Sequence, residues 1–233
     1  MHIGKAATRT IIIIAGIIAM AGAVPIVEAT ASPDARTTST IINTNDFAGY
    51  AVPSGFTSAQ ATFKIPRTSC GSAQTGLDPD IDLVGPEGLD SQVGISQFCG
   101  TNSWFVYFII NGKQTNSITV AAGNTVTATA SETLSLTNLK LKDDTTGASN
   151  AVSGPGGTVT SILIGDEANY LSPYAYLPPS RFTTDSFTKV TAGGMSLGLT
   201  DPVEAEWVHG KTVWLATSAI QGGNAFTVTF KKN

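Results

Sequence analysis

Short segments in which apolar and polar residues alternate follow one another along most of this chain. Alternation with a period of two places every second side chain on the same face of a β-strand. Helical periodicity of usable length is absent after the first residues. The pattern therefore predicts an all-β protein of many short strands. The expected strands are 59–65, 103–110 (an apolar, aromatic run), 117–120, 125–130, 133–141, 158–164, 182–190, 203–208, 212–217 and 225–230.

Turn-forming dipeptides separate these segments at regular spacing. Asn111-Gly112, Gly123-Asn124 and His209-Gly210 each stand between two alternating segments. Strands of this length, joined by turns at this spacing, are typical of antiparallel sandwiches and barrels. We expect a single antiparallel β-sandwich domain over residues 45–233.

Residues 1–31 have the pattern of a secretory signal peptide. Lys5 and Arg9 give a positive beginning, 11–24 is apolar, and Ala29-Thr30-Ala31 resembles a cleavage site. This favours a secreted, extracellular protein. Retention of the leader as a membrane anchor stays an alternative, because the apolar run is marginal in length for a span.

The remainder of the chain carries little charge. Removing Lys5, Arg9 and Glu28 from 13 basic and 17 acidic residues leaves eleven and sixteen, a net charge of −5. No basic patch with interleaved aromatic residues is present, so we expect no nucleic-acid partner. No later apolar run is long enough to cross a membrane. Residues 32–44 are rich in Ser and Thr, which predicts a flexible linker or short propeptide, and we expect a monomer.

The chain outside the leader offers few residues for catalysis. His209 is its only histidine, because His2 falls in the leader. Cys70 and Cys99 would suit a disulfide in an exported chain, with two buried free thiols as the alternative. Serine-type triads, cysteine-type dyads and His-built metal sites are therefore disfavoured. We expect no metal and no other cofactor, so any catalysis would use amides and carboxylates.

Seven blocks of the chain resemble, in the same order, blocks of one known family. They are NDFAGY at 45–50, GFTSAQATFKIP at 55–66, LVGPEG at 83–88, SQVG at 91–94, LIGD at 163–166, FTTDSF at 182–187 and FTVTF at 226–230. The family is the eqolisins, secreted glutamic peptidases that work in acid. The resemblance implies a jelly-roll-like sandwich of two curved sheets, with a polypeptide lying across a concave groove.

The family's catalytic pair consists of a glutamate and a glutamine. The glutamate acts as general base on a water and then as general acid, while the glutamine positions the water and donates to the oxyanion. The resemblance implies that Gln92 is this glutamine. It places Ile162, which cannot move a proton, at the glutamate position. Glu87 stands where the family has an aspartate, and Glu167 would reach the site only if the strand register differs.

Two functions therefore stay open, and the residues leave enzymatic activity undecided. One is a secreted glutamic endopeptidase that hydrolyses peptide bonds at acid pH, using Gln92 with Glu87 or Glu167. The other is a non-catalytic protein of the same fold that binds peptide or glycan in the retained groove, because Ile162 stands at the glutamate position. The resemblance also implies substrate-binding side chains, namely Trp104, Ser96 and Asp166.

Overall fold

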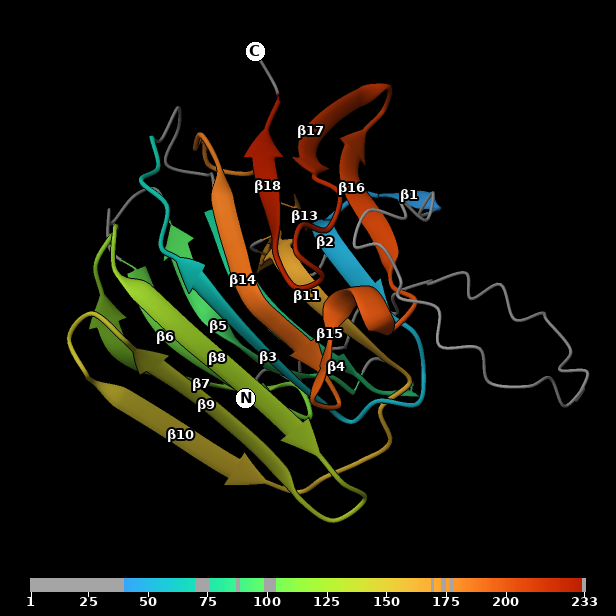
Figure 1. Ribbon diagram of the computed structural model, residues 1–233. Helices are drawn as coiled ribbons and strands as arrows, with labels where there is room; N and C mark the ends of the chain where they lie inside the picture. The colour runs from blue at the N-terminus through green and yellow to red at the C-terminus, as the bar shows by residue number, and fades with distance from the viewer. Residues whose placement is uncertain are drawn as a thin grey trace, which may run out of the picture.

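The computed structural model describes residues 40–69, 76–86, 89–98, 104–168, 170–172, 175–176 and 178–231. Within them β-strands dominate, and helical structure is limited to short 3-10 turns such as Leu197–Leu199. Most strands belong to one long sheet that folds over on itself into two layers (Figure 1). The expected all-β, antiparallel sandwich is thus confirmed.

The first layer follows the order β10-β9-β8-β3-β14-β18. All neighbours in this layer pair antiparallel. The short β15 (Met195–Ser196) continues the hairpin from β14. The bounds of the layer's strands are β3 (Ser58–Lys64), β8 (Thr125–Glu132), β9 (Thr137–Asp143), β10 (Ser149–Gly154), β14 (Asp185–Ala192) and β18 (Phe226–Phe230).

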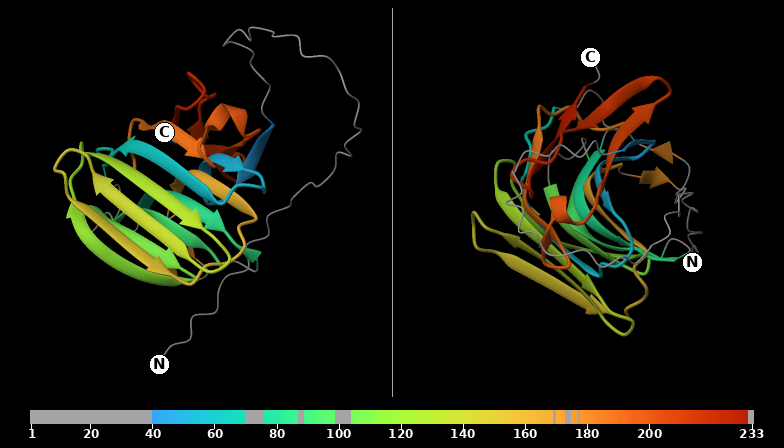
Figure 2. Two further views of the ribbon diagram at one scale, coloured as in Figure 1. Left: turned by 60° about the horizontal axis from the view of Figure 1, so that its bottom comes forward. Right: turned by 45° about the vertical axis from the view of Figure 1, so that its right-hand side comes forward.

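The second layer follows the order β2-β11-β4-β5-β6-β7, again with antiparallel neighbours. It packs against the first layer mainly where β4 and β5 face β8 and β9. Figure 2 shows the two layers from further sides. The bounds are β2 (Phe47–Val52), β4 (Gly76–Val84), β5 (Ser91–Phe98), β6 (Trp104–Ile110), β7 (Lys113–Val120) and β11 (Ser161–Glu167).

Two strands carry the sheet from one layer to the other. They are β17 (Thr212–Thr217), beside β18, and β16 (Val203–His209), beside β2. The order ends at β10 and at β7, so the sheet does not close into a barrel. A separate small hairpin pairs β12 (Tyr170–Ser172) with β13 (Ala175–Tyr176).

The core between the layers follows from the sequence alternation. In β8 every second side chain is buried, and in β9 the buried positions include Leu139 and Leu141. Phe187 of β14 stacks on Phe226 of β18 with ring centroids 4.8 Å apart. Because aromatic rings bury large apolar areas, such contacts contribute much of the stability of a sandwich core.

The domain begins earlier along the chain than we expected. Ile41–Thr44, which the sequence placed in a linker, forms β1 and pairs parallel with β16. Among the described residues no helix is long and apolar enough to span a membrane. The predicted signal peptide and both cysteines, Cys70 and Cys99, lie outside the described residues. Leader cleavage and the disulfide stay predictions.

Candidate functional site

One face of β4 carries a row of carboxyl groups. Leu77, Ile81 and Leu83 point into the core, and the residues between them alternate to the opposite face. Asp80 and Asp82 on that opposite face are fully buried. The row is completed by Asp78. A strand with apolar side chains on one face and acids on the other therefore lies near the centre of the second layer.

The strands on either side of β4 bring an amide and a further carboxylate to this row. Gln92 of β5 pairs with Asp82, and Glu167 of β11 pairs with Asp78. Because Asp78 and Asp82 are four residues apart on one strand, Gln92 and Glu167 share their face. Gln92 Nε2 donates a hydrogen bond to Glu167 Oε2 at 3.3 Å. The exposed fractions of the two side chains are 7% and 5%.

Glycine makes room for the acid between them. Gly94 of β5 pairs with Asp80, and a Cβ on Gly94 would lie 2.5 Å from the Cβ of Asp80. Contacts that short do not occur, so only glycine fits here without displacing β4. On the next strand Tyr107 pairs with Gly94, and its hydroxyl reaches across to donate to Asp80 Oδ2 at 2.7 Å. The glycine thus allows Tyr107 to bind Asp80.

A second hydroxyl holds the outer end of the row. Ser96 Oγ donates to Asp78 Oδ1 at 2.6 Å, and the Ser96 side chain is buried. Ser96 was expected to bind substrate, and the structure places it beside the carboxyl row. The face therefore combines acids with amide and hydroxyl donors.

Burial and mutual repulsion favour the protonated form of the central acid. The pKa of Asp80 is raised well above its ordinary value, chiefly by burial and then by the negative charges of Glu167 and Asp82. The hydrogen bond from Tyr107 opposes this shift in part. In an acidic medium Asp80 is protonated and neutral. Less negative charge then lies beside Glu167.

Position 162, where the family has its glutamate, and Glu167 lie on opposite faces of β11. Ile162 is fully buried between the layers, on the face opposite to Glu167, because the two are an odd number of residues apart. A carboxylate at position 162 would therefore point away from Gln92. The structure brings Glu167 to Gln92 instead. Glu87 lies outside the described residues.

Two residues that were expected to bind substrate lie in the interior. Trp104 belongs to the core cluster and is 2% exposed. Asp166 is fully buried on the core face of β11 and lies near Asp185 of β14. Neither lies on the face that carries Gln92 and Glu167, so we propose no substrate contact for Trp104 or Asp166.

The sequence analysis missed the acids of β4 and Tyr107. Its alternating segments did not include β4, because Asp and Pro are depleted in strands. A signal was nevertheless present: in LDPDIDL, at 77–83, acids occupy every second position and mostly apolar residues the others. An alternation of acid and apolar residues predicts a strand with one functional face.

Comparisons with known proteins identify the fold. The sequence matches no known protein family and no curated protein. Among solved structures, scytalido-glutamic peptidase with a transition-state analogue inhibitor matches with a TM-score of 0.69 at 16% identity. SCP-B, an eqolisin peptidase in complex with the tripeptide Ala-Ile-His, matches with a TM-score of 0.67 at 18% identity. Each match covers 80% of this chain and 98% of the other. The expected eqolisin resemblance is confirmed at the level of the fold.

Proposed function

We propose that this protein is a glutamic-type endopeptidase that hydrolyses polypeptides at acid pH, with Gln92 and Glu167 as its catalytic pair. The observation that carries this proposal is the 3.3 Å hydrogen bond from Gln92 Nε2 to Glu167 Oε2 within a buried group of acids. An amide and a carboxylate this close can hold the same water molecule. The fold that the protein shares with two glutamic peptidases supports the assignment.

In the proposed reaction Glu167 moves the protons and Gln92 stabilises charge. Glu167 takes a proton from a water whose oxygen bonds to the carbonyl carbon of the substrate. The Gln92 amide donates a hydrogen bond to the oxygen that becomes negative. Glu167 then gives the proton to the leaving nitrogen as the C–N bond breaks, so that a carboxyl group and an amine are released. The amide of Gln92 can donate at any pH of interest, which suits an enzyme that works in acid.

The acids around the pair suit the same conditions. Asp80, held by Tyr107 and with its pKa raised, is neutral over a wider pH range than an exposed aspartate. In acid it therefore adds little repulsion to the charge that Glu167 needs as a base. As the pH rises and Asp80 loses its proton, the negative potential around Glu167 grows and the fold loses stability. We expect proteolysis to be confined to the acid range.

The location that we propose follows from residues 1–31. Their signal-peptide pattern supports export of the chain, and an acid-active peptidase needs an acidic medium outside the cell. We further propose that the exported protein acts as a monomer on polypeptide substrates, without a cofactor.

The proposal is tested by acid proteolysis of a denatured protein substrate. Glu167→Gln keeps the shape of the side chain and its capacity to accept from Gln92, but it removes the proton acceptor. We expect the rate to fall by about 10²- to 10⁴-fold. Glu206→Gln on β16 removes a carboxylate elsewhere in the molecule and should leave the rate unchanged. Equal loss of activity in both variants, or no loss in Glu167→Gln, would refute the assignment.

A further inference from the structure

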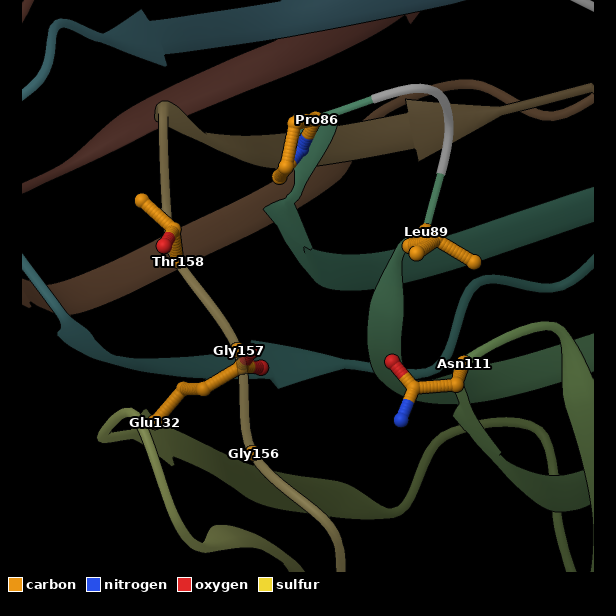
Figure 3. Close-up of a pocket in the computed structure, with 7 residues that line it drawn as sticks. All are labelled: Pro86, Leu89, Asn111, Glu132, Gly156, Gly157 and Thr158. Carbon is orange, nitrogen blue, oxygen red and sulfur yellow. The ribbon is translucent and has the colours of Figure 1, made fainter.

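A pocket of about 370 Å³ lies at one end of the sandwich, and its lining residues include neither Gln92 nor Glu167. Both layers contribute to it, together with the segment 155–160, which connects β10 of the first layer to β11 of the second. Figure 3 shows the lining side chains around the pocket. They belong to Pro86, Leu89, Asn111, Glu132, Gly156, Gly157 and Thr158.

The pocket contains a buried carboxylate without a partner. Glu132 is the last residue of β8 and follows Val126, Ala128 and Ala130 on the inward face of that strand. Its side chain is only 4% exposed, and no hydrogen-bond donor of the described residues reaches Oε2. Burying an unpaired charge is costly, so nearly all buried polar groups have a partner. The alternation of the strand favours an apolar residue at this position. The buried carboxylate of Glu132 therefore points to a ligand in the pocket.

Glycine leaves the other carboxylate oxygen accessible within the pocket. A Cβ on Gly157 would lie 2.9 Å from Glu132 Oε1, with no other atom within 4 Å. Gly157 does not adopt a left-handed conformation. The absence of a side chain at this position therefore matters mainly for the space in front of Glu132.

The rest of the lining offers neutral acceptors and an apolar wall. Asn111 Nδ2 donates to Pro155 O at 3.3 Å, and its amide oxygen points toward the other lining residues in Figure 3. Thr158 adds a hydroxyl group, and Leu89 is 51% exposed. None of the lining residues is Lys, Arg or His. Among the described lining residues, Glu132 is thus the only charged one, and it has no positive counterpart.

We propose that this pocket binds a primary alkylammonium group, carried by a free amine or by a lysine side chain of a peptide. The ammonium group lies against Glu132, with Asn111 and Thr158 as further acceptors, and the alkyl stem lies along Pro86 and Leu89. An ammonium group is a compact charge with three donors, which matches one carboxylate and two neutral oxygens. Ca²⁺ requires more oxygen ligands than this lining supplies. The volume falls within the range of small-molecule sites. This site does not depend on the proposed peptidase activity.

Binding is measured by NMR titration with n-butylammonium at low ionic strength and about pH 6, where charges are weakly screened. We expect saturable shifts at Asn111 and Gly157, with n-butanol, which lacks the charge, binding at least tenfold more weakly. Glu132→Gln should weaken n-butylammonium binding about tenfold or more, because it replaces a charge-assisted hydrogen bond by a neutral one. Glu206→Gln is the matched control and should bind as the native protein does.

A second variant tests the position of the carboxylate without changing the charge. Gly157→Ala forces Glu132 Oε1 to move and fills the space in front of it, so it should also weaken binding. In the absence of amine, Glu132→Gln should melt at a higher temperature than the native protein, because it removes an unpaired buried charge. A melting temperature raised by the amine in the native protein, and not in Glu132→Gln, completes the expected result.

Two peptides identify the source of the ammonium group. A blocked peptide with one lysine is compared with the same peptide carrying norleucine. Preferential binding of the lysine peptide extends the site to lysine side chains, and binding of n-butylammonium alone restricts it to free amines. Equal binding of n-butanol and n-butylammonium, or unchanged affinity in Glu132→Gln, would overturn the proposal.

Discussion

Asp166 and Glu167 are neighbours in β11. Because side chains alternate along a strand, they lie on opposite faces of the layer. Glu167 faces Gln92 and the acids of β4, while Asp166 faces Asp185 of the other layer in the core. Both carboxyl groups are buried, but Glu167 accepts a hydrogen bond from the side-chain amide of Gln92 on β5.

The comparison teaches that burial alone does not identify a catalytic acid. No N–H or hydroxyl donor of the described residues reaches either carboxyl oxygen of Asp166. Asp185 Oδ1 accepts the backbone N–H of Ser186 at 2.7 Å, and the side chains of Asp166 and Asp185 interact by a hydrogen bond when one of them is protonated. Both acids are fully buried, so the pair can hold a proton but is not open to solvent. We therefore propose chemistry for the Glu167 face, and we expect Asp166 and Asp185 to make stability depend on pH together with Asp80.

The largest effect is expected when a carboxylate is placed on the wrong face. Ile162→Glu would put a charge into the core at a position that is fully buried. We expect it to lower the free energy of unfolding by on the order of 3 kcal/mol or more, from lost packing and an unpaired charge. It should not increase proteolysis. Chemical denaturation and the acid protease assay check both points, and a gain of activity would show that β11 is in another register.

A smaller effect is expected from the interior pair as the pH changes. Burial raises the pKa of Asp185 from 3.8 to about 7, and the pKa of Asp166 also lies well above its ordinary value. The folded protein thus binds more protons than the unfolded chain, so stability is greatest below about pH 4 and falls as the pH rises toward 7. Asp185→Asn should remove much of this slope, on the order of a few kcal/mol.

The slope is measured from denaturation curves across that pH range. Asp201→Asn, at an exposed turn position, is the control and should keep the native slope. A native protein whose stability rises from pH 4 to 7, or a slope that is unchanged in Asp185→Asn, would contradict this account of the interior pair.

The smallest effect is expected at the edge of the catalytic face. Tyr107→Phe removes the hydrogen bond to Asp80 Oδ2 and should cost about 1 kcal/mol of stability in acid. The pKa of Asp80 should rise further, because the bond from Tyr107 lowers it. The cost should therefore be greater at neutral pH, where the Asp80 carboxylate would lack its donor. Denaturation at both pH values tests this, and an equal cost at both would speak against it.

The sequence predicted much of this fold because local alternation and turn chemistry agree with the tertiary structure. The segments around β3 and β8 alternate clearly, and those of β6 and β16 end at the Asn111-Gly112 and His209-Gly210 turns. β4 was missed because an acid stands at every second residue and a proline within the strand. β10 was missed because its small polar residues, SNAVSG, carry a weak pattern on an edge strand.

The face that carries Gln92 and Glu167 was harder to predict because it depends on register. The sequence blocks identified Gln92 but placed Ile162 at the glutamate position. Whether position 162 or 167 meets Gln92 is decided by how β11 pairs with β4 and β4 with β5, and a shift of one residue reverses every side chain. Pairing between strands that lie far apart in the sequence is not contained in local pattern.

The central claim is that Glu167, and not the neighbouring Asp166, is the catalytic acid. Its most direct test compares acid proteolysis by the Glu167→Gln and Asp166→Asn variants. The measurement is made at about pH 3, where burial favours a protonated Asp166. Both variants change one acid to its amide at adjacent positions of the same strand. We predict that Glu167→Gln loses about 10²-fold or more in rate while its fold is preserved, and that Asp166→Asn retains activity within a few-fold of the native protein. Native-level proteolysis in Glu167→Gln, or no proteolysis in the native protein itself, would contradict the account, and the second result would favour a binding protein that retains the peptidase fold.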